Sequence, residues 1–122
     1  MANNFVYNEL HSTDVKQSKS FFSELFDWTL EDVDMGEMPY TFIKTGQDQA
    51  GGGIMSQIQE GAPSMFLTYI EVDNLSESTE KAKELGGSVM VANQMAGDYG
   101  SFSVVQDPTG AVFAMWESAK KE

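Results

Sequence analysis

The feature that most constrains the fold is a pattern of strand, capped helix and three short strands that occurs twice in 122 residues. In the first half, the short run Phe5-Val6-Tyr7 before polar residues predicts a strand over Phe5–His11. Asp14 is a suitable helix N-cap with Gln17 as its capping-box partner, and apolar residues follow at helical spacing. Further strands are predicted at Trp28–Val33, Tyr40–Thr45 and Gly53–Ile58, which completes a βαβββ module over about residues 5–58.

The second half has the same order. A strand at Met65–Val72 precedes a helix that Asn74 and Glu77 would cap and that Gly86-Gly87 would end. Further strands are predicted at Ser88–Asn93, Gly100–Gln106 and Ala111–Glu117. A fixed offset of 60 positions relates the halves, pairing Asp14 with Asn74 and Met55 with Met115. We therefore predict an α+β protein, one domain over residues 1–122, whose second βαβββ module covers about residues 65–117.

The charge of the chain limits its partners. A net charge of −12 would repel a phosphate backbone and an anionic membrane surface, so nucleic acid and membrane partners are not expected. All seven basic residues are lysines, and no guanidinium is present to clamp a carboxylate or phosphate with two parallel hydrogen bonds. Anionic substrates are therefore disfavoured.

Composition also bears on compartment and stability. The chain has no cysteine, which excludes disulfides, thiol catalysis and cysteine-ligated metal. No stretch approaches the roughly 20 apolar residues that span a bilayer, and the first residues lack the order of a secretory signal. We expect a cytoplasmic protein.

Three segments carry a resemblance to a known family. They are residues 13–28, the strand and helix over Ile70–Gly87, and the closing Asp107–Glu117, which is the most specific. These segments resemble the vicinal oxygen chelate superfamily of glyoxalase, bleomycin-resistance and extradiol-dioxygenase proteins. The resemblance implies that the two modules pair into a curved, partly open mixed sheet with a concave cleft, and that the chain forms a homodimer. It does not fix a reaction, because this scaffold hosts several chemistries.

The resemblance also implies positions for the ligands of a metal ion, and the residues at these positions can be compared with those that bind metals. Enzymes of this superfamily hold a divalent ion with strand residues of both modules, and the matching positions here are Tyr7, Leu67 and Ala114. None is a good nitrogen or oxygen ligand, so we predict no metal and no other cofactor. The alternative is a displaced site in which Glu9, His11 and Glu71 hold one divalent ion.

The side chains predicted to face the cleft are mainly apolar and aromatic, which is typical of a small-molecule site. A carboxylate inside an apolar strand must face a wet cavity or find a partner, which favours Glu9 as part of a polar pocket floor. A neutral or cationic aromatic ligand fits this lining best. The predicted ligand-binding residues are Tyr7, Glu9, His11, Ile54, Leu67, Tyr69, Ala114 and Trp116, with Ser56 as a further candidate.

Several alternatives stay open at this point. The aromatic residues could simply fill the interior. The run Gly51-Gly52-Gly53 is not a phosphate loop, because no Lys-Ser/Thr follows it, and it predicts a turn or a flexible strand segment. The leading hypothesis is a small-molecule-binding protein. Its rivals are a metal-dependent lyase, isomerase or dioxygenase, an acid–base catalyst with Glu9 as the weak catalytic candidate and Tyr7 or Tyr69 as acid, and an interaction module.

Overall fold

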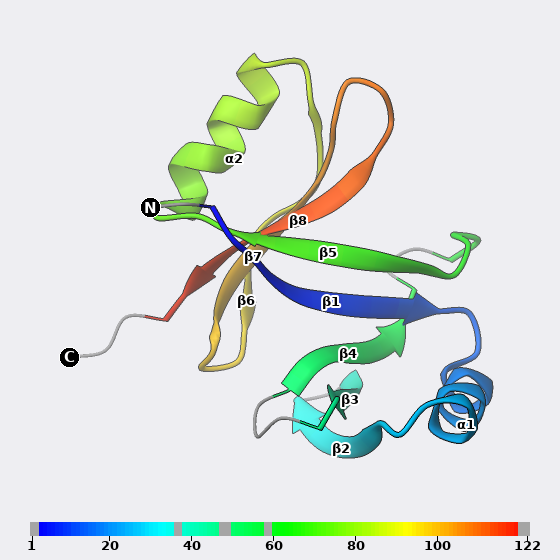
Figure 1. Ribbon diagram of the computed structural model, residues 1–122. Helices are drawn as coiled ribbons and strands as arrows, with labels where there is room; N and C mark the ends of the chain where they lie inside the picture. The colour runs from blue at the N-terminus through cyan, green and yellow to red at the C-terminus, as the bar shows by residue number, and fades with distance from the viewer. Residues whose placement is uncertain (1–2, 36–37, 47–49, 58–59, 120–122) are drawn as a thin grey trace. The chain divides into compact units, whose positions relative to one another are not determined.

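The computed structural model describes residues 3–35, 38–46, 50–57 and 60–119. It contains two compact units, one formed by Tyr7–Leu67 and the other by the chain from Thr68 onward together with the segment before Tyr7. Within the described residues there are eight strands and two helices, in the order βαβββ and again βαβββ (Figure 1). The predicted α+β fold with two βαβββ modules is confirmed, and the way in which the modules pair stays a prediction.

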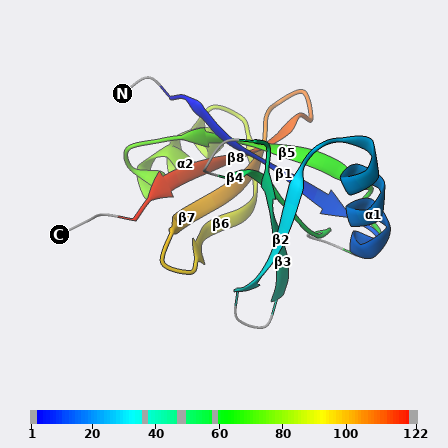
Figure 2. The same ribbon diagram turned by 60° about the horizontal axis from the view of Figure 1, so that its bottom comes forward.

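The first module places its strands in the order β2-β3-β4-β1. Strand β1 pairs with β4 in parallel, whereas the β2–β3 and β3–β4 pairs are antiparallel. Figure 2 shows β2 and β3 side by side as a hairpin. The elements are β1 (Phe5–Ser12), α1 (Val15–Leu25), β2 (Thr29–Met35), β3 (Met38–Lys44) and β4 (Ala50–Ser56).

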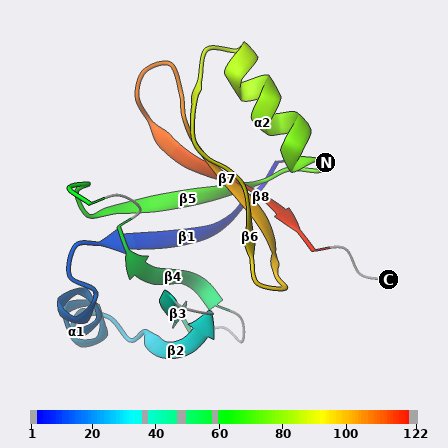
Figure 3. The ribbon, with the colours of Figure 1, turned by 180° about the vertical axis from the view of Figure 1, so that it is seen from behind.

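The second module repeats this arrangement with the strand order β5-β8-β7-β6. Its parallel pair is β5–β8, and helix α2 lies beside β6, β7 and β8 (Figure 3). The elements are β5 (Met65–Glu71), α2 (Leu75–Glu84), β6 (Ser88–Ala96), β7 (Gly100–Gln106) and β8 (Val112–Ser118).

Both helices begin where the capping residues predict. The Asp14 side chain accepts a hydrogen bond from the Gln17 backbone N–H at 3.1 Å, and Asn74 accepts one from the Glu77 N–H at 3.0 Å. Each cap satisfies one of the backbone donors that a helix start leaves without an intrahelical partner.

Each helix packs on one face of the strands of its own module and buries an apolar core there. In the first module Leu10, Ile43 and Ile54 form this core, and Phe22 of α1 packs on it. In the second module the corresponding buried residues are Val72, Leu75, Val105 and Met115. Because strand side chains alternate between faces, every second residue of these strands must point away from the helix. Within each module, the candidate functional residues lie on this helix-free face.

The triple glycine lies inside a strand. Strand β4 starts at Ala50, earlier than the predicted start at Gly53, and the predicted end at Ile58 lies outside the described residues. A side chain at Gly52 would collide with the backbone carbonyl of Asn8 on β1. Glycine is needed there because two strands approach closely, and not because the chain turns.

The fixed offset between the halves fails in the last strand of each module. Leu10 lies opposite Ile54 in the β1–β4 pair, and its counterpart Ile70 lies opposite Met115 in the β5–β8 pair. Met115 therefore corresponds to Ile54 and not to Met55. A slip of one residue exchanges the two faces of a strand, so it changes which side chains share a site.

Candidate functional site

A group of polar side chains lies on the helix-free face of the first module. Tyr7, Glu9 and His11 occupy alternate positions of β1, whereas Leu10 between them belongs to the helix-covered core. Tyr40 of β3 joins them from two strands away. We call these four residues the β1 polar cluster. The alternation of side chains along a strand predicts that the three β1 residues share one face, and they do so in the structure.

Short hydrogen bonds connect the whole cluster. The Tyr40 hydroxyl donates to Glu9 Oε2 at 2.5 Å, and 2.7 Å separates Glu9 Oε1 from His11 Nε2. The Tyr7 and Tyr40 hydroxyl oxygens are 2.8 Å apart. Because Tyr40 gives its single hydroxyl proton to Glu9, the Tyr7 hydroxyl is the donor in that second bond. The result is a chain of donors, from Tyr7 through Tyr40, that ends on the Glu9 carboxylate.

The cluster is shielded from water. Glu9 is 6% exposed, His11 3% and Tyr40 8%, whereas Tyr7 is only partly buried. Burial, followed by the negative charge of Glu9, raises the pKa of the Tyr40 hydroxyl far above its usual range. Tyr40 is therefore a fixed proton donor to Glu9 at any ordinary pH.

Gly53 of β4 makes room for the two tyrosines. A Cβ at this position would lie 2.6 Å from the Tyr7 Oη and would overlap the Tyr40 Oη and ring. Gly53 lies opposite Glu9 in the β1–β4 pair and opposite Phe42 in the β3–β4 pair. Because Gly53 has no side chain, the two tyrosine hydroxyl groups can meet beside its backbone.

The helix-free face of the second module is aromatic. The Tyr69 ring contacts the Phe102 ring at 5.9 Å and the Trp116 ring at 6.2 Å between centroids. Ala114 lies opposite both Tyr69 on β5 and Val104 on β7, and it is fully buried beneath this face. The predicted group of Tyr69, Ala114 and Trp116 is therefore present within this module.

Two of the other predicted residues lie on the helix-covered face of the first module, and the third does not. Ile54 is fully buried in the core against α1, on the opposite face from Glu9, because it pairs with Leu10. Ser56 follows the same alternation and lies opposite Ser12. Leu67 is fully buried in β5, and because it is two positions before Tyr69 it lies on the same face of that strand as Tyr69. We therefore leave Ile54 and Ser56 out of the site proposed below.

Two residues of these faces were missed from the sequence. Tyr40 and Phe102 stand within predicted strands, but only the pairing of β3 with β4 and of β7 with β8 brings them beside the other residues. The signal that could have found Tyr40 is its two-residue spacing from Phe42, with which it makes an edge-to-face contact at 5.4 Å.

The residues do not fit the divalent ion that the superfamily implies. Of the three matching positions, Leu67 and Ala114 offer only hydrocarbon, and the Tyr7 hydroxyl is bonded to Tyr40. Among the described residues, no three His, Asp or Glu side chains gather closely enough to hold a metal ion. Of the alternative ligands, Glu9 and His11 contact each other, whereas Glu71 belongs to the other compact unit.

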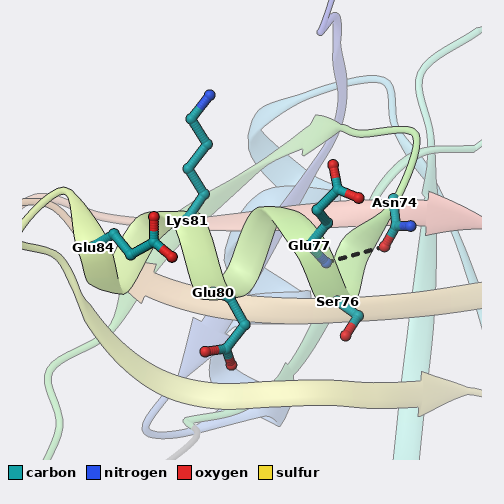
Figure 4. Close-up of a pocket in the computed structure, with 6 residues that line it drawn as sticks. All are labelled: Asn74, Ser76, Glu77, Glu80, Lys81 and Glu84. Atoms are coloured by element: carbon teal, nitrogen blue, oxygen red, sulfur yellow. Dashed lines mark hydrogen bonds between the residues drawn. The ribbon is translucent and has the colours of Figure 1, made fainter.

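Two of the surface hollows in the described residues lie outside the β1 polar cluster. The larger, of about 510 Å³, follows helix α2 (Figure 4). Its lining side chains are all exposed, and the three glutamates among them belong to a solvated helix surface. Its residues are Asn74, Ser76, Glu77, Glu80, Lys81 and Glu84. The second, of about 250 Å³, lies between Met95 and Ala119 at the ends of β6 and β8. Neither contains a predicted site residue.

In the part of the chain that the structure describes, no helix has the length and apolar character needed to cross a bilayer.

Comparison with known proteins identifies the family. The model of the Glyoxalase/Bleomycin resistance protein/Dioxygenase superfamily matches residues 5–115. The chain belongs to this superfamily. It is 33% identical over 115 residues to the protein named "Putative glyoxylase CFP32" of Mycobacterium tuberculosis. It is 28% identical over 128 residues to the anthracycline biosynthesis protein DnrV of Streptomyces peucetius. These alignments cover 90% and 93% of the chain but only 44% and 46% of the relatives, so the chain spans less than half their length.

Solved structures share the fold at low identity. The protein BH1468 from Bacillus halodurans matches all of this chain and 99% of its own, with a TM-score of 0.67 and 14% identity. Methylmalonyl-CoA epimerase from Mycobacterium tuberculosis matches 95% of this chain and 88% of its own, with a TM-score of 0.65 and 11% identity. The Mn(II)-bound glyoxalase from Novosphingobium aromaticivorans matches 98% of this chain but 42% of its own, with a TM-score of 0.62 and 16% identity.

Proposed function

We propose that this protein binds a small organic molecule, neutral or cationic and aromatic, without using the metal ligands usual in its superfamily. The observation that carries the proposal is the β1 polar cluster. A buried carboxylate with an imidazole and two phenols beside it is a costly way to fill a core, because charged groups lose hydration there. Ionisable groups kept in such surroundings are candidates for function.

The charges of the cluster and of the chain favour a ligand that is not anionic. Glu9 brings a carboxylate to the helix-free face, and the chain contains no arginine to offset it. The net charge of −12 adds a long-range field that attracts cations and repels anions. The faces of the Tyr69, Phe102 and Trp116 rings attract positive charge and stack on planar rings.

The relatives support a small organic ligand in general terms. DnrV is named for anthracycline biosynthesis, which connects that relative with small-molecule chemistry. Because the chain spans less than half of DnrV, the activity of the longer protein does not transfer directly. A cytoplasmic location and a homodimeric state are parts of this proposal.

A second candidate function is acid–base catalysis without metal, and the donor chain favours it. Glu9, which would take up the proton, is hydrogen-bonded to Tyr40, and Tyr40 is hydrogen-bonded to the partly exposed Tyr7. The groups needed for proton transfer are thus already in contact. In this reading Glu9 is the base and Tyr7 the acid, and substitution of either would remove turnover.

A further rival is a metal-dependent lyase, isomerase or dioxygenase with Glu9, His11 and Glu71 as ligands. Elemental analysis of protein purified without a metal-affinity tag tests it directly. A stoichiometric divalent ion that is lost in the His11→Gln variant would replace the metal-free proposal with this one.

Calorimetric titration tests the binding proposal. The probes are a planar aromatic cation, a neutral aromatic of the same size and an aromatic sulfonate. The wild-type protein is expected to bind the first two more tightly than about 1 mM and the sulfonate more weakly. The Glu9→Gln variant should lose about tenfold or more in affinity for the cation, since it removes a buried charge.

The matched control is Glu31→Gln. Glu31 is an exposed carboxylate of the same module, 3.1 Å from Lys44, and its removal changes the net charge by the same amount. This variant should bind as the wild type does. The proposal is refuted if no probe binds more tightly than about 1 mM, or if the two variants lose affinity equally.

A further inference from the structure

Helix α1 and the start of β5 carry large apolar side chains that the protein leaves in water. Phe21 is 59% exposed, Leu25 56% and Phe26 44%, and Phe66 of β5 is 48% exposed. We call these four residues the α1 patch, and all four belong to the compact unit Tyr7–Leu67. Taking ordinary areas for these residue types, they expose roughly 400 Å² of surface. A contiguous apolar surface of this size marks an interaction site.

The α1 patch is continuous and held in place. Phe22, which packs on the core, has ring contacts with Phe21 at 5.1 Å, Phe26 at 6.2 Å and Phe66 at 5.9 Å between centroids. Leu25 follows Phe21 by one helical turn, so their side chains are neighbours on the helix surface. A surface already ordered in the free protein loses little conformational entropy when it binds.

The second module shows that the fold itself does not require the patch. The offset of 60 positions that relates the two helices pairs Phe21 with Lys81 and Phe26 with Gly86. Of the three patch residues in this stretch, Leu25 alone has an apolar counterpart. Because the same helix position accepts an exposed lysine in the second module, the exposed rings of the first module need a reason other than folding.

Acidic side chains border the patch on α1, and the lysines of the helix lie away from it. Glu24 follows Phe21 by three positions, and the N-cap Asp14 precedes it by two helical turns, so both lie on its side of the helix. Lys16 and Lys19 lie about 140° and 160° around the helix from Phe21. Lys19 also pairs with a carboxylate of β2 at 2.8 Å. The helix surface beside the patch is therefore acidic.

We propose that the α1 patch is a docking surface for a basic amphipathic segment of another protein, in which Lys or Arg stands beside apolar residues one helical turn apart. An interface has an apolar centre and a polar rim, and the charges of the rim select the partner. The net charge of −12 attracts a cationic segment to the acidic border. The same charge opposes a second copy of this chain and an anionic membrane at this surface. The inference does not rest on the proposed ligand.

Fluorescence anisotropy of labelled synthetic peptides tests the docking surface at about 0.15 M salt. The probe is a peptide of about 18 residues, with leucines three and four positions apart and lysines at the other positions. The full chain should bind it with a Kd on the order of 10–100 µM. Two control peptides should each bind about tenfold more weakly or worse. One has Glu in place of every Lys, and the other keeps the composition but scrambles the leucines, which separates docking from charge alone.

The repeat supplies matched control variants for each part of the surface. Leu25→Gln should weaken binding of the Lys peptide by about tenfold, whereas Leu85→Gln, at the equivalent and 69% exposed position after α2, should not. Glu24→Gln should weaken it by about threefold, whereas Glu84→Gln changes the net charge equally and should not. Circular dichroism should show a native fold in all four variants, because the replaced side chains are exposed.

Four results would each overturn the inference. The Lys peptide binds more weakly than about 1 mM, the scrambled peptide binds equally well, or the variants after and within α2 lose as much affinity as those of α1. The fourth comes from sedimentation of the chain without peptide. Self-association that Leu25→Gln abolishes and Leu85→Gln preserves would assign the α1 patch to a second copy instead.

Discussion

Replacing Gly53 by alanine tests whether the β1 polar cluster depends on bare backbone in β4. The new Cβ would stand 2.6 Å from the Tyr7 Oη and closer still to the Tyr40 Oη. Since carbon atoms and their neighbours pack at about 3.5 Å, the Tyr7 hydroxyl would have to move by about 0.9 Å and the Tyr40 hydroxyl by more. Tyr40 is 8% exposed and bonded to Glu9 at 2.5 Å, so it cannot move that far and keep its bond.

The expected loss of unfolding free energy follows from the contacts that Gly53→Ala disturbs. A hydrogen bond to a buried carboxylate contributes about 1.5–3 kcal/mol, and overpacking a core costs about 1–3 kcal/mol. The backbone of Gly53 is not in the left-handed region, so alanine adds no backbone strain there. Because alanine also restricts the unfolded chain, it should offset the loss of stability by about 0.4–1 kcal/mol. We expect the Gly53→Ala variant to lose about 2–4 kcal/mol of unfolding free energy.

Urea unfolding followed by circular dichroism measures this loss. With the usual dependence on denaturant, the midpoint should fall by about 1–2 M. Gly51→Ala is the control on the same strand, because its Cβ would meet only the Thr45 side chain at 3.2 and 3.3 Å, on an exposed part of β4. It should change stability by less than about 0.5 kcal/mol.

A double substitution shows whether Tyr40 is the obstacle. In a Tyr40→Leu background, Gly53→Ala should cost clearly less than it does alone, because the hydroxyl and ring that it strikes are gone. The reasoning is refuted if Gly53→Ala is as stable as Gly51→Ala, or if its cost is the same in both backgrounds.

Two further predictions concern the second module. The Thr109 hydroxyl and the backbone N–H of Ala111 donate to Asp107 and lower the pKa of its carboxyl below 3.8. The stability that this provides is present above pH 3.8 and is lost as the pH falls through the lowered folded-state value. Urea titrations between about pH 2 and 5 should show a shallower acid loss for Asp107→Asn, and a wild-type slope would contradict this. Thr79→Val removes a buried hydroxyl that donates to the Leu75 carbonyl at 2.7 Å and pairs with Ser103 at 2.8 Å. It should cost about 1–3 kcal/mol in thermal unfolding, and a neutral effect would show that the hydroxyl pair contributes nothing.

The two-fold repeat could be predicted because its signals are local. The caps at Asp14 and Asn74 and the helical spacing after them depend only on residues a few positions apart. The same holds for the face shared by Tyr7, Glu9 and His11, since alternation along one strand needs no knowledge of its neighbours. These parts of the fold and of the candidate site were therefore accessible from the sequence.

The rest depends on how strands pair, which the sequence does not state. Ile54 was assigned to the wrong side of β4 because a one-residue change in strand register exchanges the two faces. The glycine run that includes Gly53 predicted a turn or a flexible segment. In the structure, the missing side chain of Gly53 leaves room for Tyr7 and Tyr40, which come from two other strands. Tyr40 is 31 positions from Glu9 in the chain, and only the β3–β4–β1 order brings their side chains together.

The two tryptophans of the chain are divided between the modules. Trp28 stacks on Phe22 with 5.6 Å between ring centroids, and Trp116 contacts Tyr69 on the other module's aromatic face. Each half of the repeat therefore has its own intrinsic fluorophore, in surroundings built from different rings. Replacing either indole by phenylalanine would leave emission from the other half alone, so that the order in which the duplicated halves lose structure becomes a spectroscopic observable without any added label.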